Sequence, residues 1–265
     1  MLSYPSSMSV SSRSLNMLTE ALRRERRARR TRWRRLEPGQ QALLVLAYLR
    51  KGETYADLAG GFGVCVATVF RYVREALDVL AALASPLAEA IEVARRKAFV
   101  IADGTLLRID RVGMTGGRDR PFYSGKHKRH GLNVQVLADP AGRLIWTSPA
   151  LPGARHDMGA AREHGLLDAL EAAEVRVIAD SAYRGAGANV EVPHRRPPRD
   201  PDTGERFRRL SGNEKAVNSA HARLRGPGER ANAQLKSWKI LRKIRSSPRR
   251  ATRLVDAVRS LLHAS

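Results

Sequence analysis

The hydrophobic positions of the chain follow two different periods, and the change between them divides the sequence into two parts. Between residues 40 and 83, apolar residues recur three and four positions apart, which is typical of amphipathic helices. One more helix is predicted at residues 86–97. Beyond it, β-branched runs alternate with turn residues, as in "AFVIADGTLLRI" and "GLNVQVLADPAGRLIWTSPAL", and this alternation predicts strands. The sequence therefore predicts a helical N-terminal part followed by a part that contains a sheet.

The second part has the element order of a mixed α/β domain. Three strands precede a helix at residues 154–173, and a fourth strand follows in "VRVIAD". The turn "ADPAG" joins the second and third strands, so we interpret Asp139 as a turn residue. Residues 193–212 are rich in proline and arginine and predict an irregular insertion. Helices are predicted again at 213–244 and 251–263.

The stretch "TYADLAGGFGVCVATVFRYV" (residues 54–73) predicts a helix-turn-helix. Thr54 can cap the first helix, with Asp57 closing a capping box. Gly63 allows the tight turn, and Val69 and Val73 anchor the second helix from its inner face. This recognition helix would present three side chains to the major groove of DNA: Ala67, Thr68 and Arg71. The alternative interpretation is an ordinary helical hairpin with a glycine turn.

The charge of the chain favours a polyanionic partner. Lysine and arginine total 48 against 26 acidic residues, a formal net charge of +22 over 265 residues, and nucleic acid is the leading candidate. The alternative is a ribosome-associated or merely soluble basic protein. Residues 1–35 are interpreted as a disordered basic arm, Ser-rich at first and then packed with arginine from Arg23 to Arg35, which suits phosphate contacts. No uncharged apolar stretch approaches the roughly 18 residues of a membrane span. Cys65, the only cysteine, allows no disulfide within the chain and is interpreted as a packed thiol.

Two strands of the second part end in the same tetrapeptide, "VIAD", which places Asp103 and Asp180 after apolar runs. We expect these strands to be parallel neighbours at the centre of one sheet, with the two carboxylates on the same side. A divalent cation is what would stabilise such a pair in its ionised form. A two-metal phosphoryl-transfer site usually needs a third carboxylate. The candidate is Glu229 in "RLRGPGERANAQLKSWKIL", the one acidic residue in a long basic stretch. Taken singly, Asp103 could be a turn residue, Asp180 a helix cap, and Glu229 a partner of Arg225.

These motifs together resemble the DDE transposases of bacterial insertion sequences, in the branch related to PIF/Harbinger elements that carries an N-terminal helix-turn-helix. The marks are "DGT" at Asp103, "SGKHKRHGLNVQVLADPAGR", "PGARHD" ending at Asp157, "ADSAYRG" around Asp180, and "RGPGERANAQLK". In the last, Arg225, Glu229 and Lys236 have the family's Arg-three-Glu-six-Lys spacing. Two positions differ from the family's pattern: Ala222 stands where tyrosine is frequent, and Ala182 where glycine is usual.

The resemblance implies a ribonuclease-H-like fold in which Asp103, Asp180 and Glu229 hold two Mg²⁺ or Mn²⁺ ions. It implies a domain order of a basic arm (1–35), a helix-turn-helix domain with its connecting helix (36–97) and a catalytic domain (98–265). Thr68, Arg71, Arg225 and Lys236 would contact DNA. Asp157 would be an auxiliary acidic group or a helix N-cap.

The function implied is that of a transposase, which binds its element's terminal inverted repeats, cuts them and joins them to target DNA. Such a protein would act as a homo-oligomer on DNA in the bacterial cytoplasm, at the nucleoid, without a membrane. His127, His130 and His156 are possible contacts to DNA or to the active site. The alternatives are an inactive or domesticated copy that only binds DNA, and a general metal-dependent nuclease.

Overall fold

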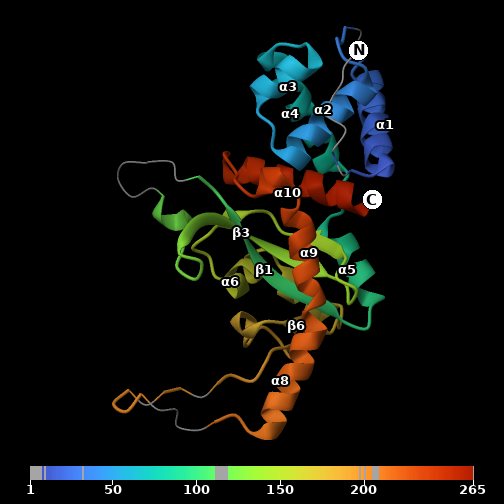
Figure 1. Ribbon diagram of the computed structural model, residues 1–265. Coiled ribbons are helices and arrows are strands. Elements are labelled where there is room, and N and C mark those ends of the chain that lie inside the picture. Colours follow the sequence, from blue (N-terminus) through green and yellow to red (C-terminus); the bar gives the residue numbers. More distant parts are fainter. Residues whose placement is uncertain are drawn as a thin grey trace.

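The computed structural model describes residues 8, 10–31, 33–110, 119–196, 198–199, 201–204 and 209–264. A group of N-terminal helices lies at one end, a sheet lies in the middle, and helices cover the sheet (Figure 1). The helices are α1 (Ser12–Ala28), α2 (Pro38–Lys51), α3 (Tyr55–Phe62), α4 (Val66–Ala82), α5 (Leu87–Arg95), α6 (Asp157–Glu163), α7 (Leu166–Ala172), α8 (Gly212–Arg225), α9 (Pro227–Lys236) and α10 (Pro248–His263). The strands are β1 (Val100–Arg108), β2 (Tyr123–Ser124), β3 (Arg129–Ala138), β4 (Leu144–Thr147), β5 (Leu151–Pro152), β6 (Val177–Ala179) and β7 (Val190–Glu191). Short 3-10 turns are η1 (Arg120–Phe122), η2 (Ser181–Tyr183) and η3 (Lys239–Leu241).

Within the described residues, seven strands form one mixed sheet in which β1 is central. The order is β2-β3-β1-β6-β7, with β4 and β5 also paired to β3. β1 and β3 are antiparallel, whereas β1, β6 and β7 run parallel to one another. The mixed α/β sheet predicted from the sequence is confirmed, including the hairpin between β3 and β4.

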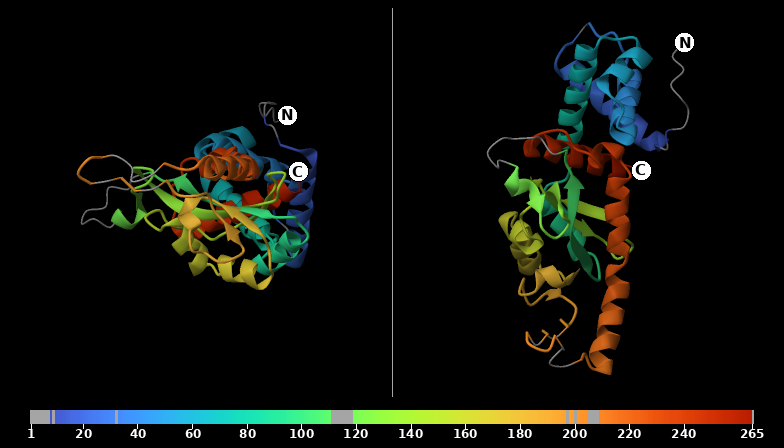
Figure 2. Two further views of the ribbon diagram at one scale, coloured as in Figure 1. Left: turned by 90° about the horizontal axis from the view of Figure 1, so that it is seen from below. Right: turned by 60° about the vertical axis from the view of Figure 1, so that its left-hand side comes forward.

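Side-chain alternation along β1 gives the sheet two apolar faces. Val100 and Ala102 belong to the core under α5, α6 and α7. Ile101 belongs to the core under α9 and α10. Figure 2 shows these helices on opposite sides of the strands. The region that follows Ala102 along β1 is therefore covered by α9 on one face and approached by α6 on the other.

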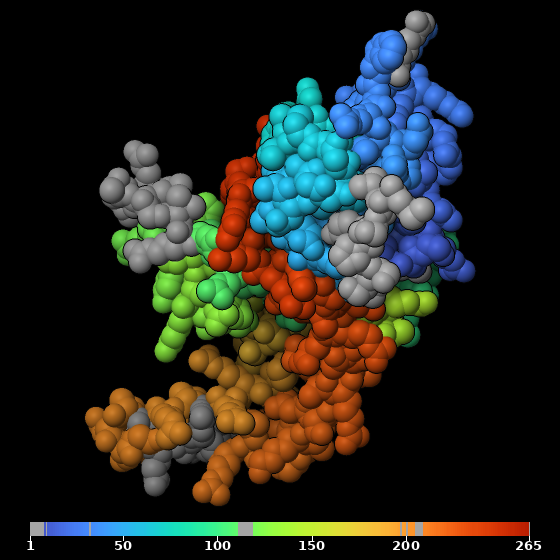
Figure 3. All heavy atoms as spheres, turned by 45° about the horizontal axis from the view of Figure 1, so that its top comes forward, coloured from blue at the N-terminus to red at the C-terminus, as the bar shows by residue number. Residues whose placement is uncertain are grey.

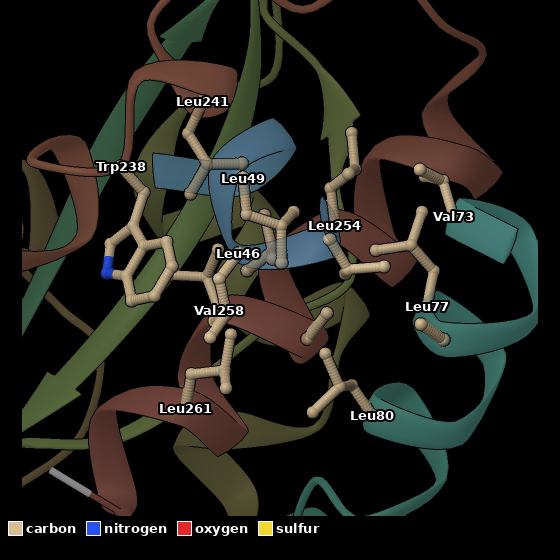
Figure 4. Close-up of a cluster of buried hydrophobic side chains, with 14 of the residues drawn as sticks. Leu46, Leu49, Val73, Leu77, Leu80, Trp238, Leu241, Leu254, Val258 and Leu261 are labelled. Carbon is tan, nitrogen blue, oxygen red and sulfur yellow. The ribbon is translucent and has the colours of Figure 1, made fainter. Parts of the chain in front are cut away.

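The N-terminal helices and the sheet part share one hydrophobic core. Apolar side chains of α2, α4 and η3 meet the inner side of α10 (Figure 4). These side chains, with their partners on α10, are Leu46, Leu49, Leu77, Leu80, Leu241, Leu254, Val258 and Leu261. Figure 3 shows α10 (red) running beneath the helical group. Because α10 lies late in the sequence, the recognition helix is fixed to the sheet part by direct packing as well as by the connecting helix α5.

Two expectations need correction. The basic arm is not disordered throughout, because α1 spans Ser12–Ala28 with Leu18 and Leu22 fully buried against the helical group; residues 1–7, 9 and 32 of that arm lie outside the described residues. The helix predicted at 154–173 is two helices, since the chain turns at Gly165 with φ 65°. The insertion expected at 193–212 is irregular where it is described, although residues 197, 200 and 205–208 lie outside the described residues.

In the described part of the chain, no single helix is long and apolar enough to cross a membrane. Helices α3 and α4 reach the required length and composition only together, and they are bent by 103° at their junction. That angle is within the range of about 90–120° that helix-turn-helix units adopt.

Candidate active site and DNA-binding surface

Asp103 and Asp180 occupy equivalent places on adjacent parallel strands. The register pairs Ala102 with Ala179, and each aspartate is the next residue of the chain, Asp103 within β1 and Asp180 just beyond β6. Residues in register on parallel neighbours point to the same side of a sheet. Asp180 follows the end of β6, where its carboxylate accepts a hydrogen bond of 2.8 Å from the backbone N–H of Ala182. The prediction of two neighbouring, parallel "VIAD" strands at the centre of the sheet is confirmed.

The electrostatics of Asp103 show that carboxylates converge here. Burial raises the pKa of Asp103, Arg225 lowers it, and Asp180 and Asp157 raise it again, for a net rise. The pKa of the Tyr183 phenol is raised well above its ordinary value by burial first and then by the same three carboxylates. One buried ring thus lies within the field of Asp103, Asp157 and Asp180.

Asp157 joins this cluster from α6. It is the first residue of α6, and its carboxylate accepts a hydrogen bond of 2.8 Å from the Asn133 amide. Gly104 makes room for it, since a Cβ at that position would lie 2.0 Å from Asp157 Oδ1. Lys126 Nζ lies 3.1 Å from Asp157 and 3.8 Å from Asp180. Burial lowers the pKa of Lys126, but the nearby carboxylates outweigh it and the net shift is upward.

Helix α9 closes the cluster from the other side. It lies directly on β1, because a Cβ at Gly228 would lie only 2.6 Å from the Ile101 side chain. One turn along, the Asn232 amide donates a 2.8 Å hydrogen bond to Asp103. Lys236, a further turn along, is also within the field of Asp103, although burial lowers the pKa of Lys236 overall.

Glu229 lies on the helical face that Asn232 and Lys236 share, three and seven residues before them. Its side chain is 73% exposed, and its Oε1 lies 3.7 Å from Arg225 NH2. Among the described residues the structure gives Glu229 no contact with Asp103 or Asp180. No group of three or more His, Cys, Asp or Glu side chains in the described part is spaced to hold a metal ion.

A groove of about 670 Å³ opens beside the aspartates. Its lining includes Lys126, His127, His156, Asp157 and Asp180. His130 lies apart from the groove, where it pairs with Asp119 at 3.3 Å and contacts the Tyr123 ring edge. Two of the three histidines noted in the sequence therefore face the groove.

The helix-turn-helix forms at the predicted residues. The Thr54 hydroxyl accepts a hydrogen bond from the Asp57 N–H, and Gly63 turns the chain with φ 61°. The Asp57 carboxylate does not close a capping box on the backbone; it accepts a hydrogen bond from the Thr54 hydroxyl instead. On the outer side of α4, Arg71 is exposed and donates a 3.1 Å hydrogen bond to the partly exposed Thr68.

Cys65 does not have the packed environment that we expected. The thiol is exposed at the N-cap of α4 and lies 3.1 Å from the Thr68 hydroxyl. Hydrogen bonds to Thr68 lower the pKa of this thiol. The apolar residues Val64 and Val69 fill the turn, so the thiol between them in sequence is left outside.

Comparison with known proteins agrees with this geometry. The family model for the DDE superfamily endonuclease matches residues 102–263. The chain belongs to this family. A second model, for the helix-turn-helix of DDE superfamily endonucleases, matches residues 34–86. The chain is 31% identical over 245 residues to a protein of Streptomyces albus G that carries the name of a transposase for insertion sequence element IS112, covering 89% of this chain and 84% of that protein. No solved structure matches the chain.

Family membership confirms a DDE transposase with an N-terminal helix-turn-helix and a ribonuclease-H-like catalytic part. DDE endonucleases generally depend on divalent metal ions. The structure brings together Asp103, Asp180 and Asp157, places Lys236 nearby, and leaves Glu229 at the edge of the cluster.

The sequence interpretation missed three polar side chains of the cluster. They are Lys126, Asn133 and Asn232, each within hydrogen-bond distance of one of the aspartates. Only Asn232 had a usable signal, because it lies three residues after Glu229 on the same face of a helix.

Proposed function

We propose that this DDE transposase binds the terminal repeats of its element through α4, cuts the DNA next to them, and joins the freed ends to target DNA. The observation that supports the proposal is the placement of Asp103 and Asp180 directly after the paired residues Ala102 and Ala179 of two adjacent parallel strands, beneath the helix that carries Glu229. A homo-oligomer on DNA would hold two ends together.

The donor set suits a divalent cation. Carboxylate and amide oxygens are ligands suited to Mg²⁺. The cluster offers Asp103, Asp180 and the buried Asn232 Oδ1, which has no hydrogen-bond partner within the described part of the chain. Two side-chain cations already lie among these carboxylates: Lys126 between Asp157 and Asp180, and Arg225 near Asp103 and Glu229. Positions that attract an ammonium and a guanidinium are positions where a metal cation is stabilised too.

We assign Asp103, Asp180 and Glu229 as the residues that would hold one or two Mg²⁺ or Mn²⁺ ions. When bound, such ions lower the barrier to in-line attack of water, or of a 3′ hydroxyl, on a phosphodiester. Glu229 needs a rotamer change to leave Arg225 and turn towards Asp103, which its exposed position permits.

The protein's own residues orient the DNA. Lys236 and Arg225 would bind phosphates beside the scissile bond, and Thr68 and Arg71 would contact the repeat. Asn232 would hold Asp103 in place through its 2.8 Å hydrogen bond, which also fixes α9 against the strand.

A second candidate function is a transposase copy that has kept DNA binding without cutting. The pairing of Glu229 with Arg225, away from the two aspartates, favours it. Incubating the protein in MgCl₂ with duplexes from either side of its gene, and with an unrelated duplex, separates these functions. Breaks at fixed positions near the ends of the element support the transposase. Breaks in the unrelated duplex as well indicate a general nuclease. Binding without breaks indicates a copy that only binds DNA.

A further inference from the structure

Trp33 is the most exposed large hydrophobic side chain of the described residues. It is 95% exposed, and the next, Val66 at the start of α4, is 48% exposed. Single exposed hydrophobic residues are common on protein surfaces. The residues around Trp33 therefore decide whether its exposed ring belongs to a binding surface.

The chain on both sides of Trp33 is tied down. Before it, the Thr31 N–H donates a hydrogen bond of 3.1 Å to the Arg26 carbonyl at the end of α1. After it, Arg34 pairs with Glu75 of α4 at 2.6 Å. The next buried residue is Leu36, whose N–H donates to the Tyr72 hydroxyl at 3.2 Å. The described residues on either side of Trp33 are thus tied to α1 and α4, and the indole itself is exposed.

A buried polar network sets this segment against the recognition helix. Glu75 accepts hydrogen bonds from Arg34 at 2.6 Å and from Gln41 of α2 at 2.9 Å. Gln41 in turn accepts one of 2.6 Å from Arg26 of α1. Arg26 Nε has no hydrogen-bond partner among the described residues, but the other bonds of this network satisfy Glu75 and hold one arrangement in place. Residues 31 and 33–35, which we call the Trp33 segment, therefore have a defined position relative to α4.

The Trp33 segment and α4 face each other across a hollow of about 470 Å³. The segment lines one side, and Thr68, Arg71 and Tyr72 of α4 line the other. The described lining contains three arginines and no acidic side chain. Thr68 and Arg71 are the residues predicted to face DNA, so Trp33 is exposed on the DNA-facing side of the unit.

We propose that the Trp33 segment is a second DNA-binding element, in which the Trp33 ring packs against duplex DNA beside the base pairs contacted by α4. The inference rests on the proposed DNA-binding role of the helix-turn-helix. The exposed Arg35 beside the ring binds a phosphate, and the ring covers the apolar deoxyribose and base edges next to it. Trp33 thereby adds a contact that does not depend on charge, next to contacts that do.

Tryptophan fluorescence tests the contact directly. The other two tryptophans, Trp146 and Trp238, are 5% and 3% exposed, so acrylamide quenching reports on Trp33. Adding a duplex from either side of the gene should protect the emission from acrylamide. In Trp33→Phe the remaining tryptophans are already shielded, and the same DNA should leave quenching unchanged. Protection that appears with rising protein concentration in the absence of DNA would assign the surface to a second copy of the chain and overturn the proposal.

Salt-dependent affinity separates this contact from the charged ones. Trp33→Ala should weaken duplex binding about 10-fold with the slope of affinity against salt unchanged, since no charge is removed. Arg35→Ala, in the same segment, should reduce the slope by about one. Trp33→Phe should restore most of the affinity, because its ring can pack in the same way.

Failure of the Trp33 inference and failure of the proposed function give different experimental results. If the wild type binds duplex DNA and Arg71→Ala weakens it, but Trp33→Ala binds like the wild type and Trp33 stays accessible to acrylamide, this inference is wrong and the proposed function stands. If no duplex binds at all, the DNA-binding role of the helix-turn-helix fails, and this inference fails with it.

Discussion

Two carboxylates, Glu75 in the helical group and Asp103 in the sheet part, have opposite surroundings. Glu75 is satisfied by Arg34 and Gln41, and its side chain is 7% exposed. Among the described residues, Asp103 accepts a hydrogen bond from one neutral donor, Asn232, and its pKa is raised by burial and by the neighbouring carboxylates. Glu75 is buried on α4 and Asp103 is half-buried beneath α9, so both are partly or wholly withdrawn from water, and their partners are what separates them.

The difference lies in the balance of donors and acceptors. A carboxylate that is fully paired stabilises one arrangement of the chain. A group of carboxylates that share too few cations is costly to assemble and has capacity for another cation. By this criterion we interpret Glu75 as structural, and we propose that the cluster of Asp103, Asp157 and Asp180 is functional.

The largest effect is expected from replacing Glu229, a proposed metal ligand beside the aspartate cluster. Glu229→Gln should lower strand cleavage by about 100-fold or more, since loss of a ligand should exceed the roughly 10- to 100-fold cost of losing a partner behind one. Duplex binding should change little. Glu171→Gln, at an exposed acidic position on α7, is the matched control for cleavage assays. Normal cleavage by Glu229→Gln would remove this residue from the site.

The next effect concerns recognition. Arg71→Ala should weaken binding to duplexes from the element's ends by about 1–3 kcal/mol if Arg71 contacts a guanine in two places. A gel-shift titration on end and random duplexes measures it. Equal losses on both would assign Arg71 to a phosphate, and no loss on either would place it outside the interface.

Gly104 tests the fit between β1 and α6. Gly104→Ala places a methyl group where Asp157 Oδ1 lies, so the free energy of unfolding should fall by about 1–3 kcal/mol. Gly159→Ala is the matched control, because nothing lies within 4 Å of a Cβ there and the residue is helical. That control should be neutral or stabilising by about 0.5–1 kcal/mol. Urea denaturation of both variants decides it, and equal stability of Gly104→Ala and the wild type would contradict the close contact.

Asp139 is a second carboxylate that, like Glu75, is satisfied by hydrogen-bond donors, and it tests whether such carboxylates stabilise the fold. Burial raises the pKa of Asp139, but hydrogen bonds from the backbone and side chain of Arg143 and from the Ala141 N–H outweigh it, and the net shift is downward. Because the folded-state pKa lies below the unfolded one, this stabilisation is present above the unfolded pKa and is lost as pH falls through the folded pKa. Asp139→Asn should therefore be less stable than the wild type by about 1–2 kcal/mol at about pH 7, with a smaller difference in acid. A stability difference that grows in acid would reverse the assignment.

The sequence was sufficient to predict the two strands that position Asp103 and Asp180. Apolar runs that end in Asp103 and Asp180 predict parallel neighbours, because such runs are buried on both faces of a sheet. The helix-turn-helix is likewise predicted from local features: a helix cap at Thr54, a turn at Gly63 and an inward-facing side chain at Val69. Each of these signals lies within about one helix or strand.

The remaining features depend on contacts between distant segments. Leu18 and Leu22 form one stripe of a helix whose other faces are basic and polar, and that charge masked the order of α1. Lys126 reaches the aspartates only because β3 returns beside β1. Asn232 meets Asp103 because Gly228 lets α9 approach β1 closely, an approach that no local pattern contains.

The central claim is that Asp103 and Asp180 form a binding site for a divalent cation. The most direct measurement is a titration of the protein with Mn²⁺, followed by the paramagnetic resonance signal of the free ion. We expect saturable binding by the wild type, weakened at least about 10-fold in Asp103→Asn and in Asp180→Asn and unchanged in Asp168→Asn, an exposed acidic position on α7. Equal Mn²⁺ affinity in the wild type and in both aspartate variants would contradict the claim.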